Sequence, residues 1–399
     1  MRLQPLQVTA FPCAIVLYVA LAAGAFASDP DSCIRDFDSQ WDYFPDKAVV
    51  EYAHGFSVRY HRHYKVLSIQ NPYDGVRDLL VLVQCGAPVP KLEGELATAP
   101  IISIPARTVG ANEDLSLSRA RVLGYAQHVV AMGGGGIFAP SLRQRWESGA
   151  AVSIGESFHG QPDYEKLLAA APDVVFLSTA SIARAESIRR ARAIDIAAVP
   201  SMSWVEATVL GQAEWLQVVA IFFNEEAKAN SILSGIKHRY RNLSEQARAQ
   251  PSSPTVVWIN PAEQRNKWVV PEANWLAQLL TDAGGLTPWV DPQGAPERTV
   301  TTEQVLKFAK ATDAFITATV ALGDPGALGA LEGSPAIRQG RLFDVHHRSR
   351  PEQNAYDWYE SAVVEVDRVL EDIVALLHPT LVPGHEFHHL RPLRNKSGR

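Results

Sequence analysis

Histidines and a glutamate near the carboxyl end of the chain have the spacing of a zinc site. His385, Glu386 and His389 satisfy the pattern H-E-x-x-H. On a helix this pattern brings two imidazoles to one face and leaves the glutamate to act as a base, as in zinc metallopeptidases. Gly384 precedes the pattern and Pro392 soon follows it, so barely two helical turns fit. A secreted zinc metallopeptidase is therefore an alternative hypothesis, and no catalytic or metal-binding residue is assigned.

Other residue types that carry out catalysis give no stronger pattern. The glycine run 133–136 lacks the Lys-Ser/Thr of a P-loop and does not match G-x-G-x-x-G, so it predicts a strand-to-helix loop. The pairs His61/His63 and His346/His347 can bind metals, but solvated or structurally buried histidines are the usual case. We therefore predict that the protein is not an enzyme and uses no cofactor.

Aromatic and arginine side chains favour a binding site instead. Trp268 is predicted to lie in a strand-to-helix loop, where an aromatic ring can line a cleft. Arg107 is placed at a strand end, and Arg348 or Arg350 after the last strand, so these side chains can face an anionic ligand. Stacking and charge-assisted hydrogen bonds would hold a flat or anionic chelate there. The candidate ligand-binding residues are Arg107, Trp268, His346, Arg348, Tyr356 and Trp358.

Two glutamates are candidates for contact with a partner protein. Glu165 and Glu303 each occupy the first turn of a predicted helix that leads to an aspartate opening a buried strand. An acid in the first turn stabilises the helix dipole by ~0.3–1 kcal/mol, which alone can explain both residues. One exposed acid on each of two lobes would also make a two-point electrostatic dock for a basic partner.

The order of predicted elements indicates how these residues are positioned. Strands alternate with helices from about residue 101 to 202 and again from 255 to 377, which predicts an α/β fold with mostly parallel sheets. Residues 204–249 contain only helix formers. They predict one helix over Val205–Phe223, about 28 Å long, and a second that Asn224 caps. Before the lobes, Phe56–Tyr60 and Tyr64–Gln70 alternate as a β-hairpin does.

Composition and the amino-terminal residues suggest a folded, exported protein. The chain has 399 residues, of which 47% are hydrophobic and 20% charged, with a net charge of −6. These values exclude a disordered chain and argue against a nucleic-acid partner. Residues 1–27 have the charged start, apolar run and Ala-Phe-Ala site of a cleavable signal peptide, which predicts a periplasmic or secreted location. Cys33 and Cys85 remain after cleavage and are predicted to form one disulfide.

The predicted organisation follows from these features. Its parts are a signal peptide (1–27), an N-terminal extension with a β-hairpin (28–98), an N-terminal α/β lobe (99–203), linking helices (204–249), a C-terminal α/β lobe (250–392) and a basic tail (393–399).

Several short stretches occur in an order typical of one family. They include Pro172-Asp-Val-Val-Phe, Phe222-Phe-Asn-Glu-Glu-Ala, Trp268-Val-Val-Pro, Asp282-Ala-Gly-Gly and Leu377-His-Pro-Thr-Leu-Val-Pro-Gly-His-Glu. From about residue 48 to 392 the chain resembles the substrate-binding proteins of ABC importers for iron–siderophore complexes and cobalamin. The resemblance implies a class III periplasmic binding protein, with two Rossmann-like lobes joined by a single long α-helix.

The same resemblance implies a function and partners. It implies that a monomer captures an Fe(III)–siderophore between the lobes, with cobalamin or haem as alternative ligands, and delivers it to an ABC permease. Glu165 and Glu303 lie where family members carry the lobe-tip glutamates that meet permease arginines. His385–His389 fall in the family's C-terminal tail, which argues against the metallopeptidase. A secreted adhesion or partner-binding module without a small ligand is a further alternative.

Overall fold

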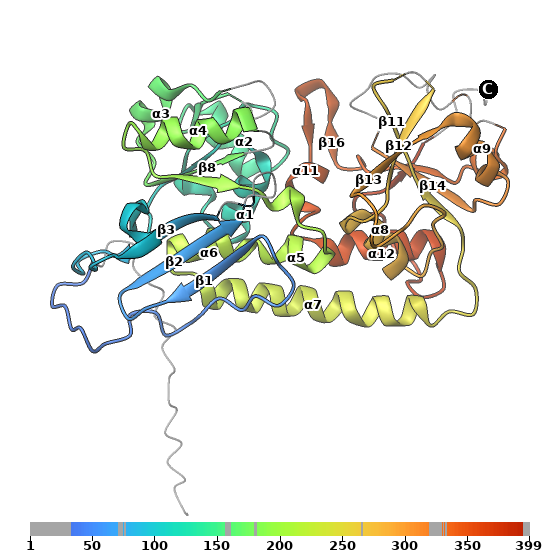
Figure 1. Cartoon of the computed structure of the whole chain (residues 1–399). Coiled ribbons are helices and arrows are strands. Elements are labelled where there is room, and N and C mark those ends of the chain that lie inside the picture. Colours follow the sequence, from blue (N-terminus) through green and yellow to red (C-terminus); the bar gives the residue numbers. More distant parts are fainter. Residues whose placement is uncertain are drawn as a thin grey trace, which may run out of the picture.

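Two α/β lobes lie side by side along one long helix (Figure 1). The computed structural model describes residues 33–70, 75, 77–155, 161–178, 182–264, 266–318, 329, 331 and 333–393. The long helix α7 (Glu226–Arg248) has 23 residues, which corresponds to about 34 Å, and it runs beneath both lobes in Figure 1. The predicted fold class is thereby confirmed. The predicted signal peptide and residues 394–399 of the predicted tail lie outside the described residues.

The N-terminal lobe is built on a parallel sheet of five strands in the order β7-β6-β5-β8-β9. Every residue of β8 is buried, as expected for a strand covered on both faces. The strands are β5 (Val109–Ala111), β6 (Val129–Met132), β7 (Val152–Ser153), β8 (Val174–Ser178) and β9 (Ala198–Ser201). The helices are α1 (Asp114–Val122), α2 (Pro140–Glu147), α3 (Tyr164–Ala170) and α4 (Ile182–Arg192).

The C-terminal lobe has a sheet in the order β10-β14-β15-β18, of which the last strand is antiparallel. The strands of this sheet are β10 (Val256–Trp258), β14 (Ala314–Thr317), β15 (Leu342–Asp344) and β18 (Arg391–Pro392). The helices of the lobe are α8 (Trp275–Asp282), α9 (Thr302–Ala309), α10 (Pro335–Arg338), α11 (Trp358–Ser361) and α12 (Val366–Leu377). Two antiparallel sheets are added to this lobe. One has three strands, β11 (Asn260–Pro261), β12 (Lys267–Pro271) and β13 (Glu297–Thr301). The other is a hairpin of β16 (Ser349–Arg350) and β17 (Ala355–Tyr356). The sequence did not predict these additions.

The N-terminal extension contributes a separate sheet in the order β1-β2-β3-β4. β1 (Phe56–Tyr60) and β2 (Tyr64–Gln70) form the predicted antiparallel hairpin, followed by β3 (Arg77–Gln84). β4 (Ile101–Ile104) pairs with β3 in parallel, although the apolar run 101–109 on its own predicts one strand of the N-terminal lobe. The run divides at Pro105, which has no N–H for a sheet ladder. Therefore β4 belongs to the extension's sheet, and the lobe's sheet starts at β5.

The linking segment contains three α-helices within the described range 182–264. α5 (Val209–Glu214) and α6 (Leu216–Phe223) meet at Trp215, and α7 follows. The single helix predicted over Val205–Phe223 is therefore wrong, and the long linking helix is the one that follows it. No helix in the described part of the chain is long and apolar enough to cross a lipid bilayer.

Asn224 lies at the turn between α6 and α7 and does not cap the second helix as predicted. Its backbone is left-handed, with a φ of 56°, and it ends α6, a position that asparagine tolerates better than most residues. Its side chain accepts a hydrogen bond from Lys65 Nζ at 2.7 Å and donates one to Gln84 Oε1 at 2.8 Å. The turn is therefore fixed by the extension's sheet.

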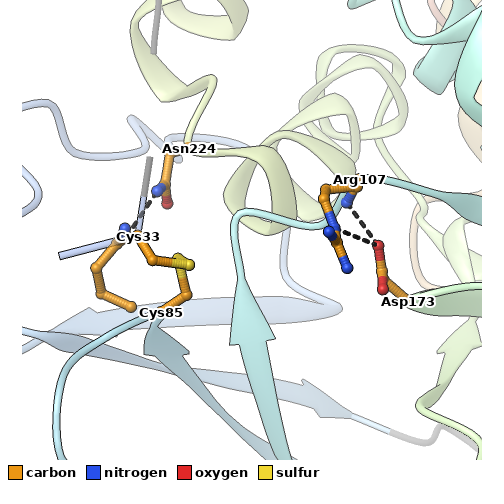
Figure 2. The surroundings of a disulfide bond; sticks show 6 residues. Cys33, Cys85, Arg107, Asp173 and Asn224 are labelled. Carbon is orange, nitrogen blue, oxygen red and sulfur yellow. Dashed lines mark hydrogen bonds and ion pairs between the residues drawn. A yellow bond between two sulfur atoms is a disulfide. The ribbon is translucent and has the colours of Figure 1, made fainter. Parts of the chain in front are cut away.

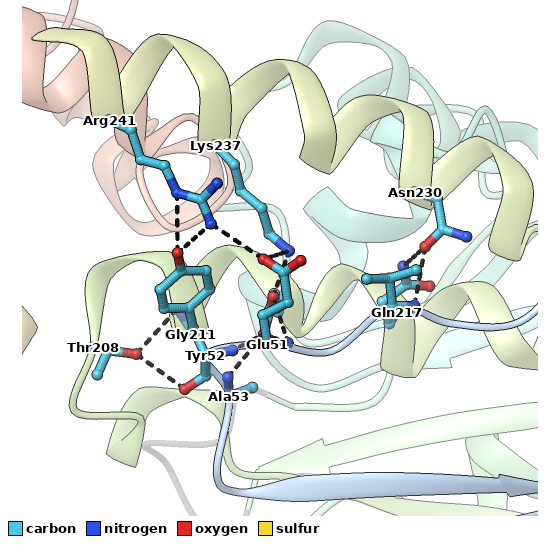
Figure 3. Close-up of polar contacts among 11 residues, drawn as sticks. Glu51, Tyr52, Ala53, Thr208, Gly211, Gln217, Asn230, Lys237 and Arg241 are labelled. Atoms are coloured by element: carbon cyan, nitrogen blue, oxygen red, sulfur yellow. Dashed lines mark hydrogen bonds and ion pairs between the residues drawn. The ribbon is translucent and has the colours of Figure 1, made fainter.

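A disulfide and a polar cluster attach the extension to the rest of the molecule. Cys33 and Cys85 are bonded, with their Cα atoms 4.8 Å apart, close to the turn at Asn224 (Figure 2). The pairing is the one predicted. On the other side of the extension, Lys237 and Arg241 of α7 reach Glu51 and Tyr52 (Figure 3).

Candidate functional site

The chain after β15 brings a histidine and two tyrosines together at the carboxyl edge of the C-terminal sheet. His346 is fully buried, and its ring centroid lies 4.9 Å from that of Tyr356 and 5.8 Å from that of Tyr359. Burial lowers the pKa of His346 to about 4, so the ring is neutral at neutral pH. Neither ring nitrogen has a hydrogen-bond partner among the described residues.

Two arginines of the same edge reach across to the other lobe. The guanidinium carbons of Arg348 and Arg350 lie 5.4 and 5.7 Å from the ring centroid of Phe138. Phe138 belongs to the loop that leaves the carboxyl end of β6, and Figure 1 shows β16 standing between the lobes. Arg348 is also 3.1 Å from Asp357 through its Nε and keeps 34% of its side chain exposed. Cation–π contacts of this kind are attractive, and they join the two lobes.

A buried glutamate makes a second contact between the lobes. The Glu360 carboxylate, on α11, accepts the backbone N–H groups of Phe138 and, at 3.0 Å, of Ala139. Ala139 precedes α2 and has no capping side chain of its own, so Glu360 supplies the acceptor that the helix start lacks. Burial raises the pKa of Glu360 to about 7.

The glycine run allows this approach of the lobes. A Cβ atom on Gly136 would lie 2.9 Å from the backbone oxygen of Asn354, in the β16–β17 hairpin. Any larger residue would push the hairpin away. The run is the strand-to-helix loop that the sequence predicted.

Three of the six predicted ligand-binding residues lie together, namely His346, Arg348 and Tyr356. Arg107 does not join them. It precedes β5 and therefore lies at the amino edge of the N-terminal sheet, where its backbone N–H donates to Asp173 Oδ2 at 2.8 Å and its Nε is 3.9 Å from the same atom (Figure 2). The sequence pattern places Arg107 at a strand end because the apolar run 101–109 predicts one strand.

The two predicted tryptophans are core residues rather than cleft residues. Trp268 is buried on β12, and its indole N–H donates to Thr302 Oγ1 at 3.1 Å. Trp358 is buried in α11, with its ring centroid 5.7 Å from that of Trp258 and 6.0 Å from that of Trp275. Packing in the C-terminal lobe covers both rings, so neither tryptophan is part of the proposed ligand site.

The H-E-x-x-H stretch is not a metallopeptidase site. Residues 384–390 form no helix, so nothing places His385 and His389 on one helical face. The stretch instead folds around the buried carboxylate of Asp372, which lies 2.6 Å from His385 Nε2 and accepts the backbone N–H groups of His389 and Leu390 at 2.6 and 2.9 Å.

Sequence reasoning missed Phe138, Asp357, Tyr359 and Glu360. The pattern of residues 354–377 predicts one helix, but the structure divides them into a short strand, α11 and α12. Phe138 and Glu360 are separated by 222 positions in the chain. The glycine run before Phe138 predicted a strand-to-helix loop there, but not its contact with the other lobe.

The two candidate docking glutamates lie on different lobes. Glu165 is exposed in the first turn of α3, and Glu303 is exposed in the first turn of α9. A hydrogen bond with Thr301 and one with the backbone lower the pKa of Glu303, so it is anionic at neutral pH. Figure 1 shows α3 and α9 on the side of the lobes that faces away from α7.

Comparisons with known proteins agree with this architecture. Residues 138–314 match the sequence model of a family described as periplasmic binding protein. An uncharacterized lipoprotein of Methanocaldococcus jannaschii is 22% identical over 251 residues, which cover 60% of this chain. The chain spans 56% of the length of that curated relative.

Solved structures share the fold at low sequence identity. A periplasmic heme-binding protein from Pseudomonas aeruginosa is 13% identical with a TM-score of 0.55, and the match covers 73% of this chain and all of that one (100%). A petrobactin-binding protein from Bacillus subtilis is 14% identical with a TM-score of 0.52, over 77% and 98% of the two chains. A periplasmic binding protein from Veillonella parvula is 10% identical with a TM-score of 0.55, over 79% and 98%. All three are binding proteins.

Proposed function

From its confirmed resemblance to the periplasmic binding proteins, we propose that this chain captures a metal chelate between its two lobes. The observation that carries the proposal is the meeting of Arg348 and Arg350 of one lobe with Phe138 of the other. In open α/β sheets, ligands bind beyond the carboxyl ends of the strands, and these residues follow β15 and β6.

The chemistry of these side chains suits a flat or anionic chelate. Arginines form charge-assisted hydrogen bonds with carboxylates and other oxyanions, and the aromatic rings of Tyr356, Tyr359 and Phe138 can stack on a planar ligand. We propose an Fe(III)–siderophore as the ligand, with haem or cobalamin as alternatives. Petrobactin-binding and heme-binding proteins with this fold support a siderophore or haem as the ligand.

Delivery to an ABC importer is the second part of the proposal. Glu165 and Glu303 would dock onto basic residues of a permease, one from each lobe, while the protein itself is a monomer. Their exposure on the side opposite α7 supports this role. Export through the predicted signal peptide would place the protein outside the cytoplasm, where the Cys33–Cys85 disulfide is stable.

A thermal-shift and calorimetric screen tests the ligand. Ferric hydroxamate and catecholate siderophores, haem and cobalamin are added to the mature chain. The true ligand at 100 times its Kd should stabilise the protein by about 2.7 kcal/mol. Failure of every chelate to stabilise the protein would refute the proposal.

Two arginine variants then locate the site. Arg350→Ala should weaken binding by roughly 10- to 100-fold, the value of one hydrogen bond to a charged group. Arg107→Ala is the matched control at the opposite sheet edge and should bind as the wild type does. Equal losses in both variants would contradict a site between the lobes.

A further inference from the structure

Three side chains that can ligate a metal meet behind the contact between the lobes. Asp357, His388 and His389 each offer one ligand atom, and these atoms all lie within 4.8 Å of one another. Asp357 immediately precedes α11, and the two histidines precede β18. Asp357 and His389 are buried and His388 is half-buried. The group differs from the H-E-x-x-H set, because it uses His388 and Asp357 in place of His385 and Glu386.

His389 is the member of this group whose ring nitrogens lack hydrogen-bond partners in the described part of the chain. It has no exposed surface (0%), and neither ring nitrogen has a hydrogen-bond partner among the described residues. Buried polar groups in proteins are normally satisfied. Its ring is enclosed by Trp358, with 5.7 Å between centroids, and by His388, with 4.7 Å.

The other two residues are oriented by neighbours, as metal ligands usually are. Asp357 Oδ2 accepts a hydrogen bond from Ser361 Oγ at 2.7 Å. His388 Nε2 lies 2.9 Å from Glu365 Oε2, and Nδ1 of the same ring lies 3.3 Å from Arg348 Nη1. Two imidazoles and one carboxylate are a donor set that Zn²⁺ takes readily.

A cation already lies beside this group. The Arg348 guanidinium contacts both Asp357 and His388, so it would compete with a bound metal. Because about a third of its side chain is exposed (34%) and Phe138 lies on its other side, Arg348 can turn away from the group without becoming buried and unpaired. At longer range, the positive charge of Arg121 acts on Asp357 and that of Arg368 acts on His389. Asp357 and Glu365 supply the opposing negative charge.

We propose that Asp357, His388 and His389 form a binding site for a divalent transition metal of the Zn²⁺ type, distinct from the chelate site. Arg348 lies between the two sites and would be displaced from this group when the metal binds.

Calorimetric titration of the metal-free mature chain with ZnCl₂ tests the site. The wild type should bind one Zn²⁺, and MgCl₂ should give no binding because Mg²⁺ prefers oxygen ligands. Asp357→Asn and His389→Gln should each weaken Zn²⁺ binding by at least about tenfold. Arg348→Ala should strengthen it, because the competing charge is removed. His347→Gln is the control: this exposed histidine lies outside the group and its loss should leave the affinity unchanged.

Circular dichroism checks that each variant folds. If either buried variant fails to fold, His388→Gln decides in its place, because that ring is half-buried. Absence of Zn²⁺ binding by the wild type would overturn the proposal. Wild-type affinity in the folded ligand variants, or weaker binding by Arg348→Ala, would overturn it as well.

Discussion

Replacing Glu214 by Gln should detach the segment that leads into the extension's sheet. The Glu214 carboxylate is fully buried and accepts the backbone N–H groups of Glu51, Tyr52 and Ala53, at 2.9, 2.8 and 2.8 Å. Lys237 Nζ lies 2.6 Å from the same carboxylate. A glutamine keeps the shape but has only one acceptor oxygen and turns an NH₂ group towards N–H donors.

The size of the loss follows from burial. Removing one partner of a buried ion pair costs about 3–5 kcal/mol. In Glu214→Gln the buried Lys237 keeps only Glu51, whose side chain is exposed, as a partner, and three backbone N–H groups lose a charged acceptor. We therefore expect Glu214→Gln to lower the free energy of unfolding by about that amount. Glu51→Gln is the matched control, because Glu51 pairs with the same Lys237 but keeps 47% of its side chain exposed. Exposed pairs contribute ~0–1 kcal/mol.

Urea unfolding followed by tryptophan fluorescence measures both losses. Hydrogen exchange at the amides of residues 51–53 should accelerate in Glu214→Gln and stay slow in Glu51→Gln. The reasoning is refuted if Glu214→Gln loses less than about 1 kcal/mol, or no more than its control does.

Two further predictions concern the disulfide and the contact between the lobes. Cys33→Ser with Cys85→Ser should lower the free energy of unfolding by about 4 kcal/mol, the chain-entropy value for a loop of this length; unchanged urea stability would contradict this. The pKa of Glu360 rises on folding from 4.5 to about 7, so folding favours the protonated carboxyl group. The protonated group's contribution to the free energy of unfolding is complete below pH 4.5 and is lost as the pH rises through 7. Between pH 5 and 8 the wild type should therefore lose up to about 3 kcal/mol relative to Glu360→Gln, and parallel pH profiles of the two proteins would show that the carboxylate is not titrating there.

The alternation of strands and helices was predictable because each element carries its own hydrophobic period. β1, β2 and α3 begin and end where the pattern placed them. The linking helices were predicted less well. Residues 205–223 are helix formers throughout, and nothing in their composition reveals the break at Trp215, which depends on how α5 and α6 pack.

The candidate site was predicted in part, for a physical reason that differs from residue to residue. Arg348 was a candidate because it follows a predicted strand, and Tyr356 because it is one of the aromatic residues of the C-terminal half. Trp268 was misplaced because an aromatic ring in the sequence has the same character whether it packs in a core or lines a cleft. Glu360 was missed because its role comes from a helix start in the other lobe. Such contacts depend on tertiary structure.

The central claim is that one ligand is held by both lobes. Hydrogen exchange of the mature protein, with and without the chelate that stabilises it most, tests this directly. We expect binding to slow exchange at residues 133–139 and 346–359 together, since these segments meet across the lobes. Slower exchange in one lobe alone, or only in the extension before residue 105, would contradict the account.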